Sequence, residues 1–393
     1  MITLSQAIEI IQSEVNQIVG EEKVNLWDSL GRVLAKDVIS DMNMPPFNKT
    51  AVDGYACRMA DAFNELEVIE IIPAGIIPQK VVGVGQCSKI MTGAMIPQGA
   101  DCVLMVEDTK EISGNRMQFT GQKPKSNICI LGEDIKTGDI AIPKGTLISR
   151  QHIAIMAALG CHQPIVMRKP SVAILVTGDE LVEPEVIPQG GQIRNSNGHQ
   201  LVAQVLNANA EVNYIGIVKD TEEETYNALS GALAKNDIVI LTGGVSMGDY
   251  DYVPAVMKKL GISILFDSIS IQPGKPTKFG VKEGKLVFGL PGNPVSTYMQ
   301  FEILVKPVIQ RLMGAESKDE FIARLPLGKT YTRKRVERLG IIPVAITKDQ
   351  KVEAIEFHGS AHIFALAKAD GYIMIPLGIG ELKEGELVDV RPL

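Results

Sequence analysis

The chain has 393 residues, 45% of them hydrophobic, which is enough for about two to four domains, each with its own core. Its 39 basic and 46 acidic residues give a net charge of −7, which argues against nucleic-acid or membrane-surface binding because these need a basic face. No segment approaches the ~18 apolar residues of a membrane span, and the N-terminus lacks a signal pattern, so we expect a cytoplasmic protein.

The cysteines and histidines predict neither a disulfide framework nor a zinc site. The five cysteines are scattered and odd in number, without a C-x-x-C pair: Cys57, Cys87, Cys102, Cys129 and Cys161. We therefore expect these cysteines to act as small buried hydrophobic residues in a protein of a reducing compartment. The five histidines have no ligand spacing.

The N-terminal part predicts two helices that flank an insertion. Apolar residues recur at helical spacing over residues 3–19, where Thr3 or Ser5 can cap the helix, and a second helix is expected over 149–159 before Gly160. We expect residues 1–45 and 146–169 to form one discontinuous helical and linker domain. Between them, residues 46–145 alternate short β-prone pieces with Pro and Gly turns and predict an inserted β domain.

Residues 170–318 predict a doubly wound α/β domain. The runs 171–177 and 237–241 are rich in Val, Ile and Leu without alternation, as expected of parallel strands that are buried on both faces. Predicted helices (197–208, 221–235, 251–260 and 294–313) alternate with further strands (214–218 and 285–289). Short strands return over 319–393 and predict a small, barrel-like C-terminal β domain.

Both long apolar runs end in loops that carry glycines and acids. The first continues as Gly178, Asp179 and Glu180, and the second as Thr242, Gly243, Gly244, Val245, Ser246, Met247, Gly248, Asp249, Tyr250 and Asp251. At the carboxyl end of a parallel strand, backbone N–H groups face the ligand crevice, and carboxylates there can bind Mg²⁺. The second loop fits neither a Walker loop nor G-x-G-x-x-G. Two interpretations of this loop therefore stay open. It either binds a phosphate through a cation or is an ordinary turn with an Asp cap.

Two Pro-Gly turns, 271–276 and 290–294, follow apolar segments that we place in the same sheet. Lys275 is a candidate contact for a phosphate or oxyanion, and Asn293 and Ser296 are candidates at the start of the last helix. Pro-Gly alone also marks ordinary turns. The basic cluster of Arg333, Lys334, Arg335 and Arg338 is either a solvated strand edge or an anion site.

Nine segments, in chain order, together resemble the molybdopterin molybdenumtransferase family, the MoeA proteins related to the gephyrin E domain. They are PPFNKTAVDGYA, KIMTGAMIPQGAD, GEDI, SVAILVTGDEL, GQIRNSN, LTGGVSMGDYDYV, PGKP, LPGNPVS and HGSAHI. The resemblance implies a homodimer with active sites between subunits and an α/β domain of the molybdopterin-binding type. It also implies Mg²⁺-dependent insertion of molybdate into adenylylated molybdopterin with release of AMP. The molybdopterin adenylyltransferase would be a partner.

The resemblance also implies roles for particular residues. Implied catalytic residues are Asp53, Thr92, Asp134, Glu180, Asp220 and Asp251, with Glu180, Asp220 and Asp251 as Mg²⁺ ligands and the first three supplied by the β insert of the partner subunit. Implied substrate-binding residues are Thr242, Gly243, Gly244, Ser246 and Asp249 for the adenylate, and Lys275, Pro291, Gly292, Asn293, Ser296, Arg338 and Ser360 around molybdate.

Two departures and two alternatives accompany this interpretation. Gln272 stands where many family members have lysine, and the arginine expected from the C-terminal domain is Arg333, Arg335 or Arg338, of which we favour Arg338. One alternative is the preceding adenylylation enzyme, although that protein usually consists of the α/β domain alone. The other is a non-catalytic, gephyrin-like scaffold. We expect no additional linker or domain in this chain, which argues against a scaffold.

Overall fold

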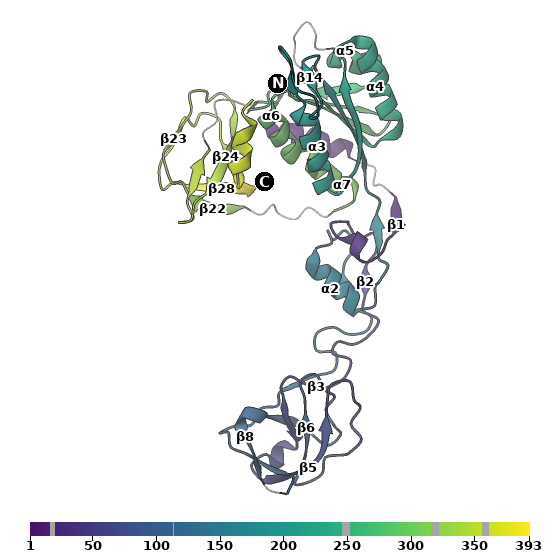
Figure 1. Cartoon of the computed structure of the whole chain (residues 1–393), viewed down its shortest axis with the longest axis vertical. Helices are drawn as coiled ribbons and strands as arrows, with labels where there is room; N and C mark the ends of the chain where they lie inside the picture. The colour runs from purple at the N-terminus through teal and green to yellow at the C-terminus, as the bar shows by residue number, and fades with distance from the viewer. Residues whose placement is uncertain (16–19, 113, 246–251, 316–321, 356–360) are drawn as a thin grey trace. The chain divides into compact units, whose positions relative to one another are not determined.

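The computed structural model describes residues 1–15, 20–112, 114–245, 252–315, 322–355 and 361–393 (Figure 1). The chain divides into two compact units. Unit 1 comprises Met1–Lys36, Gly145–Ser149 and Ile165–Leu393, and unit 2 comprises Asp37–Lys144 and Arg150–Pro164. The discontinuous segment that we predicted over 1–45 and 146–169 is therefore shared between the two units.

The centre of unit 1 is a six-stranded sheet of order β16-β13-β17-β21-β20-β18. Its strands are β16 (Glu211–Val218), β13 (Ser171–Thr177), β17 (Ile238–Thr242), β21 (Lys285–Leu290), β20 (Lys278–Lys282) and β18 (Ser263–Phe266). The first four run parallel, whereas β20 is antiparallel to both of its neighbours. All five residues of β17 are buried, as expected for a strand covered on both faces.

Helices cover both faces of this sheet (Figure 1). On one face lie α3 (Ser196–Asn207), α6 (Pro294–Gln300) and α7 (Lys306–Leu312), and on the other lie α4 (Glu222–Lys235) and α5 (Val253–Lys259). Asn195 caps α3 and Thr221 caps α4, each by accepting a backbone N–H of the first turn. The α/β prediction is thus confirmed, and none of the described helices is long and apolar enough to cross a bilayer.

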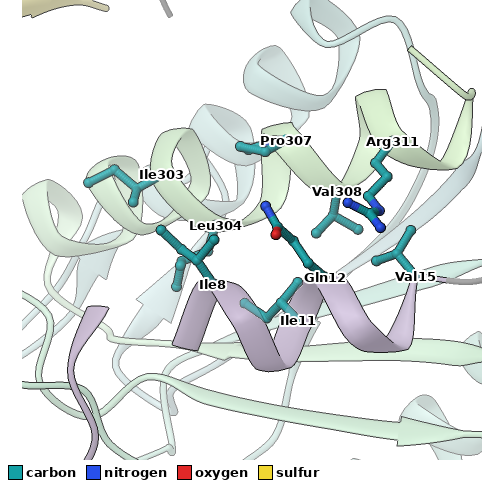
Figure 2. Close-up of a pocket in the computed structure, with 9 residues that line it drawn as sticks. All are labelled: Ile8, Ile11, Gln12, Val15, Ile303, Leu304, Pro307, Val308 and Arg311. Atoms are coloured by element: carbon teal, nitrogen blue, oxygen red, sulfur yellow. The ribbon is translucent and has the colours of Figure 1, made fainter. Parts of the chain in front are cut away.

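Helix α1 (Leu4–Glu14) is shorter than the predicted span of 3–19 and packs onto the same core as α6 and α7. Thr3 and Gln6 form a capping box at its start. Opposite α1 lies a π-helical turn, η4 (Phe301–Val305), which precedes Pro307, a residue without the N–H that an α-helical hydrogen bond needs. Figure 2 shows the pocket of about 40 Å³ between these helices, lined by Ile8, Ile11, Gln12, Val15, Ile303, Leu304, Pro307, Val308 and Arg311.

The C-terminal part of unit 1 is a β domain, and its sheet includes one strand, β19, from the segment that forms the α/β domain. The sheet has the order β19-β24-β26-β28-β22, with β25 paired to β24. Its strands are β19 (Ile271–Gln272), β24 (Leu339–Ile346), β26 (Gly371–Ile375), β28 (Leu387–Pro392), β22 (Ala323–Pro326) and β25 (Val352–Ala354). Two further strands of this part, β23 (Tyr331–Thr332) and β27 (Glu381–Leu382), pair with each other. The 3₁₀ helix η5 (Ile363–Lys368) precedes β26.

The segment 271–276 follows β18 of the α/β sheet, as we predicted, but its first two residues add a feature that the sequence did not predict. They form β19, which pairs in parallel with β24 of the C-terminal sheet. The chain leaves the α/β sheet after β18, contributes two residues to the other sheet and returns as β20. The Lys275 turn therefore lies where the two sheets adjoin.

Unit 2 contains the predicted inserted β domain. Its six-stranded sheet has the order β7-β4-β6-β5-β9-β8, formed by β7 (Cys102–Met105), β4 (Gly54–Cys57), β6 (Gln86–Ile90), β5 (Glu65–Ile72), β9 (Arg116–Phe119) and β8 (Thr109–Ile112). Cys57, Cys87 and Cys102 are buried in its core. The helix α2 (Arg150–Ala158) belongs to the same unit.

Several short strand pairs complete the two units. In unit 1, β1 (Glu21–Lys23) pairs with β12 (Ile165–Met167), and β14 (Leu181–Val182) pairs with β15 (Ile193–Arg194). In unit 2, β2 (Val38–Ile39) pairs with β11 (Ile140–Ile142), and β3 (Lys49–Thr50) pairs with β10 (Ile128–Cys129).

Asp237, just before β17, predicts a stability effect. Its carboxylate accepts the N–H of Ser171 at 2.8 Å and the Ser171 hydroxyl at 2.9 Å, and pairs with Arg168 at 3.1 Å. Burial alone would raise the pKa of Asp237, but these partners outweigh it and hold the pKa below its usual value. We expect Asp237→Ala to cost about 1–3 kcal/mol at neutral pH, because the Ser171 N–H loses its acceptor.

Thermal unfolding midpoints at several pH values check this expectation. Because the folded pKa is depressed, the contribution is complete above the ordinary carboxyl pKa of about 3.9 and is lost as the pH falls below it. The difference from the native sequence should therefore shrink between neutral and strongly acidic pH. Asp389→Ala, which removes an exposed carboxylate from β28, is the control. A difference that does not change with pH would contradict the assignment.

Candidate functional site

The predicted site residues of the α/β domain follow the ends of its four parallel strands. Asp179 and Glu180 come after β13, Asp220 after β16, Gly243 and Gly244 after β17, and the turn Pro291–Asn293 after β21. Because these strands are parallel and adjacent, all four ends lie at one edge of the sheet. That edge is where open α/β sheets bind ligands.

Three carboxylates gather at the ends of β13 and β16. The Asp220 N–H donates to Asp179 Oδ1 at 3.2 Å. Burial is the main cause that raises the pKa of Asp220, the negative charges of Asp179 and Glu180 add to it, and the Thr177 hydroxyl opposes it. Among the described residues, no group of three or more His, Cys, Asp or Glu side chains is arranged to hold a metal ion. Asp251, the third predicted ligand, lies outside the described residues.

The glycine pair after β17 is required by a close approach to β13. Gly243 and Gly244 have φ values of +89° and +57°, in the left-handed region. A Cβ on Gly243 would lie 2.3 Å from the Thr177 carbonyl oxygen, and one on Gly244 would lie 2.7 Å from Thr177 Oγ1. The two strand ends can meet only without these side chains. Ser246 and Asp249, predicted in the same loop, fall outside the described residues.

A buried polar network joins the ends of β17 and β21 to α3 and α6. Thr242 Oγ1 donates to the Pro291 carbonyl at 2.9 Å, and Asn197 Nδ2 donates to the Gly292 carbonyl at 2.8 Å. Thr297 Oγ1 also donates to the Pro291 carbonyl. Our sequence reasoning named Thr242 but missed Asn197 and Thr297. The one sequence feature that could have indicated these two residues is a polar side chain on the buried face of each predicted helix.

A cleft of about 1050 Å³ lies between the Pro291–Asn293 turn, the Lys275 turn and the C-terminal β domain, all in unit 1. Its lining includes six predicted residues, namely Lys275, Pro291, Gly292, Asn293, Ser296 and Arg338. Five cations line it: Lys275, Arg333, Lys334, Arg335 and Arg338. No Asp or Glu is present among the described residues of the lining. The basic cluster therefore lies at a cleft and not only along a solvated strand edge.

The three candidate arginines differ in what holds them. The Arg333 guanidinium donates to the carbonyl oxygens of Ile379, Pro376 and Arg338, at 2.8, 2.6 and 3.0 Å. Burial lowers the pKa of Arg333. These bonds make Arg333 a brace for the loop that carries Arg335 and Arg338. The latter two thus remain the candidates for contact with an anion.

A residue of α6, Gln300, contacts the Lys275 turn and fixes its backbone. A cis peptide bond joins Gln272 to Pro273, and Gly274 has a φ of +107°. A Cβ on Gly274 would lie 2.4 Å from Gln300 Nε2, the amide that donates to the Pro273 carbonyl. The Lys275 carbonyl accepts the N–H groups of Ile269 and Thr277, while its side chain is exposed. Gln272 contributes a neutral side chain to the cleft lining. Ser360 lies outside the described residues.

In unit 2, the structure joins two of the three predicted residues. Asp53 Oδ1 accepts the Thr92 N–H at 2.6 Å and the Thr92 hydroxyl at 2.8 Å. These bonds, the backbone one first, lower the pKa of Asp53. Asp134 is exposed in its loop, where its N–H donates to the Met44 carbonyl at 3.0 Å.

Comparison with known proteins identifies the family. Three family models match in chain order: the MoeA N-terminal region (domain I and II) over residues 2–160, a probable molybdopterin binding domain over 173–311, and the MoeA C-terminal region (domain IV) over 325–393. The molybdopterin molybdenumtransferase of Staphylococcus epidermidis is 37% identical over 401 residues, covering 99% of this chain and 95% of the relative. The chain belongs to the molybdopterin molybdenumtransferase family.

Further relatives agree with this identification. The molybdopterin molybdenumtransferase of Bacillus subtilis is 35% identical over 382 residues, covering 94% of this chain and 89% of the relative. The crystal structure of a molybdopterin biosynthesis moeA protein from Pyrococcus horikoshii OT3 has a TM-score of 0.85 at 31% identity, with 100% of both chains covered. The predicted family, fold class and transferase class are confirmed.

This transferase of molybdenum cofactor biosynthesis has two chemically distinct environments at neighbouring strand ends. Carboxylates follow β13 and β16, and a cationic cleft lies beside β21, where arginine and lysine can donate charge-assisted hydrogen bonds to an anion.

Proposed function

We propose that this family member catalyses the Mg²⁺-dependent insertion of molybdate into adenylylated molybdopterin, with release of AMP. The observation that carries this proposal is the cationic cleft. Five basic residues line a volume of about 1050 Å³, of which Arg333 is held by backbone carbonyls, and the described lining contributes no carboxylate that would repel an anion. Pockets for small organic ligands measure about 300–1,000 Å³, so the cleft has room for a pterin as well as a tetrahedral oxyanion.

Within the cleft, we assign the oxyanion to Lys275, Ser296 and Arg338. Lys275 has an exposed ammonium on a turn whose backbone is fixed, and Arg338 lies on the loop that Arg333 braces. Ser296 lines the cleft, although its residue is only 2% exposed. Preorganised donors of this kind bind an oxyanion without reorganising.

The carboxylate edge fits magnesium in its donor chemistry. Glu180 and Asp220 would hold the ion together with Asp251, and the ion would supply charge neutralisation at the adenylate phosphates. The raised pKa of Asp220 reflects burial and the adjacent carboxylates, a repulsion that a cation would relieve. Gly243 and Gly244 would bring backbone N–H groups close to the phosphates, since neither carries a side chain.

The reaction balances without a net change in water, because one step releases a water and the other consumes one. Molybdate and the pterin dithiol condense, so that two Mo–S bonds replace one Mo–O bond and one water leaves. One water then cleaves the phosphoanhydride and releases AMP. The protein's part is to hold both reactants in register and to stabilise the negative charge that develops on the phosphate oxygens.

Molybdate-dependent AMP release is the test of this function. Purified protein, adenylylated molybdopterin and Mg²⁺ are incubated with and without molybdate, and AMP is quantified by chromatography. We expect AMP only in the complete mixture. Supplying molybdopterin with ATP instead tests the adenylyltransferase alternative, whose product is pyrophosphate. If no molybdate-dependent AMP forms, the transferase proposal is wrong, and an inactive protein in both arms favours the scaffold.

We also propose that the enzyme is a cytoplasmic homodimer and receives its substrate from the molybdopterin adenylyltransferase. Light scattering tests the dimer, and copurification tests the partner. Molybdate and tungstate are tetrahedral dianions of the same charge, so parallel titrations of AMP release with both ions decide the preferred oxyanion.

A further inference from the structure

The turn Pro291–Asn293 presents three consecutive carbonyl groups next to an anion cleft. Pro291 has no N–H and Gly292 has no side chain, so neither residue has a side-chain donor that could fix the turn. Gly292 and Asn293 are exposed, and both line the cleft. A carbonyl oxygen that pointed into this cleft would repel an anion. The direction of these carbonyls therefore affects binding.

Buried side chains bind the Pro291 and Gly292 carbonyl oxygens, whereas the Asn293 oxygen accepts the backbone N–H of Thr297 at 3.0 Å in the first turn of α6. Thr297 Oγ1 lies 2.5 Å from the Pro291 oxygen and 3.1 Å from the Asn293 oxygen. Asn197 Nδ2 lies 2.8 Å from the Gly292 oxygen and 3.1 Å from Thr242 Oγ1, which itself donates to Pro291. Thr242 and Thr297 are 0% exposed and Asn197 is 7% exposed. The carbonyls accordingly face the protein and not the cleft.

This arrangement has a cost that stability alone does not explain. A carbonyl oxygen can only accept, so the Asn197 amide must direct its nitrogen to Gly292. Its Oδ1 is then buried without a hydrogen-bond partner among the described residues. Leaving a buried acceptor unsatisfied is unfavourable, and such groups in native proteins call for an explanation.

We propose that Asn197 and Thr297 are positioning residues that turn the Pro291 and Gly292 carbonyls away from the cleft and so make it selective for an anion. The inference rests on the proposed function, because it takes the oxyanion to bind in this cleft. Neither side chain touches the substrate. They act through the turn, and their loss should weaken oxyanion binding more than it slows the chemical step.

The test compares Thr297→Val with Thr297→Ser in the AMP-release assay. Thr297→Val keeps the side-chain shape and removes the hydroxyl, and we expect a KM for molybdate about 10-fold higher with kcat changed less than about 3-fold. Thr297→Ser restores the donor and should restore the KM. Thr225→Val is the matched control, since Thr225 is also buried (2% exposed) but lies on α4, outside this network.

The outcomes separate this inference from the proposed function. If the native enzyme shows no molybdate-dependent AMP release, the proposed function fails and the inference with it. If the native enzyme is active and Thr297→Val keeps its KM for molybdate, the inference alone is overturned. Should Thr297→Val fail to fold, Asn197→Ala replaces it, with the same expected rise in KM. A rise of equal size in Thr225→Val would also overturn the inference, since it would show a general effect of lost stability.

Discussion

Lys275→Ala is expected to lower kcat/KM for molybdate by about 100-fold, as expected for the removal of one preorganised oxyanion donor. Lys275 is the cation on the turn between the two sheets, and its ammonium is exposed in the cleft while its backbone carbonyl accepts two N–H groups. Gln272 contributes no charge nearby, so no second cation on this turn compensates for the loss. Initial rates of AMP release at varied molybdate concentrations measure the effect.

Two variants control for the loss of a lysine. Lys329→Ala removes an exposed lysine of the C-terminal β domain that pairs with Glu353 at 3.0 Å and does not line the cleft, so it should leave the rate unchanged. Lys275→Arg keeps the charge and should retain more activity than alanine, although its planar fork differs from a point charge. If Lys275→Ala stays within about 3-fold of the native rate, Lys275 is not an oxyanion ligand.

Asp220→Asn is expected to lower kcat by about 100-fold and to raise the Mg²⁺ concentration needed for half-maximal activity. The substitution keeps the shape of the side chain and removes its negative charge. It leaves the backbone N–H that donates to Asp179 intact, so the strand end should keep its conformation. A magnesium titration of AMP release at saturating molybdate measures both quantities.

The pH dependence gives an independent check on Asp220. Burial and the nearby carboxylates raise its pKa, so Asp220 becomes protonated at a higher pH than an ordinary aspartate as the pH falls. The magnesium requirement of the native enzyme should therefore increase on the acidic side at a pH above about 3.9, whereas that of Asp220→Asn should not follow this step. Asp389→Asn, an exposed carboxylate on β28, is the matched control. An unchanged magnesium requirement in Asp220→Asn would remove this residue from the metal site.

Local patterns were sufficient for the architecture of the α/β domain. Continuous apolar runs over 171–177 and 237–241 predicted buried parallel strands, and both occur as β13 and β17. The glycine pair 243–244 indicated a turn at the end of the second run, and the close approach of Thr177 explains why this turn needs glycines. Such features depend on residues close in sequence, where periodicity and backbone preference act directly.

Contacts between residues that are far apart in the sequence decided which turns and arginines form the cleft, which local patterns could not predict. The two residues of β19 carry no signal for the sheet that they join, yet their pairing with β24 brings the Lys275 turn to the arginine loop. The choice among the arginines also depended on distant partners, because the carbonyls of Pro376 and Ile379 occupy Arg333. Asn197 and Thr297 were missed for the same reason, since their partners lie on other elements.

By itself, the sequence determined the family, the fold class and the order of the strand-end loops, because these are written in local composition and motifs. Only the tertiary structure decided that a basic cluster and two Pro-Gly turns line one cleft, and that buried hydroxyl and amide groups hold its wall. The physical reason is that an anion site depends on the direction of charges and dipoles from distant segments. Those directions are set by packing and hydrogen bonds between elements, which no local pattern contains.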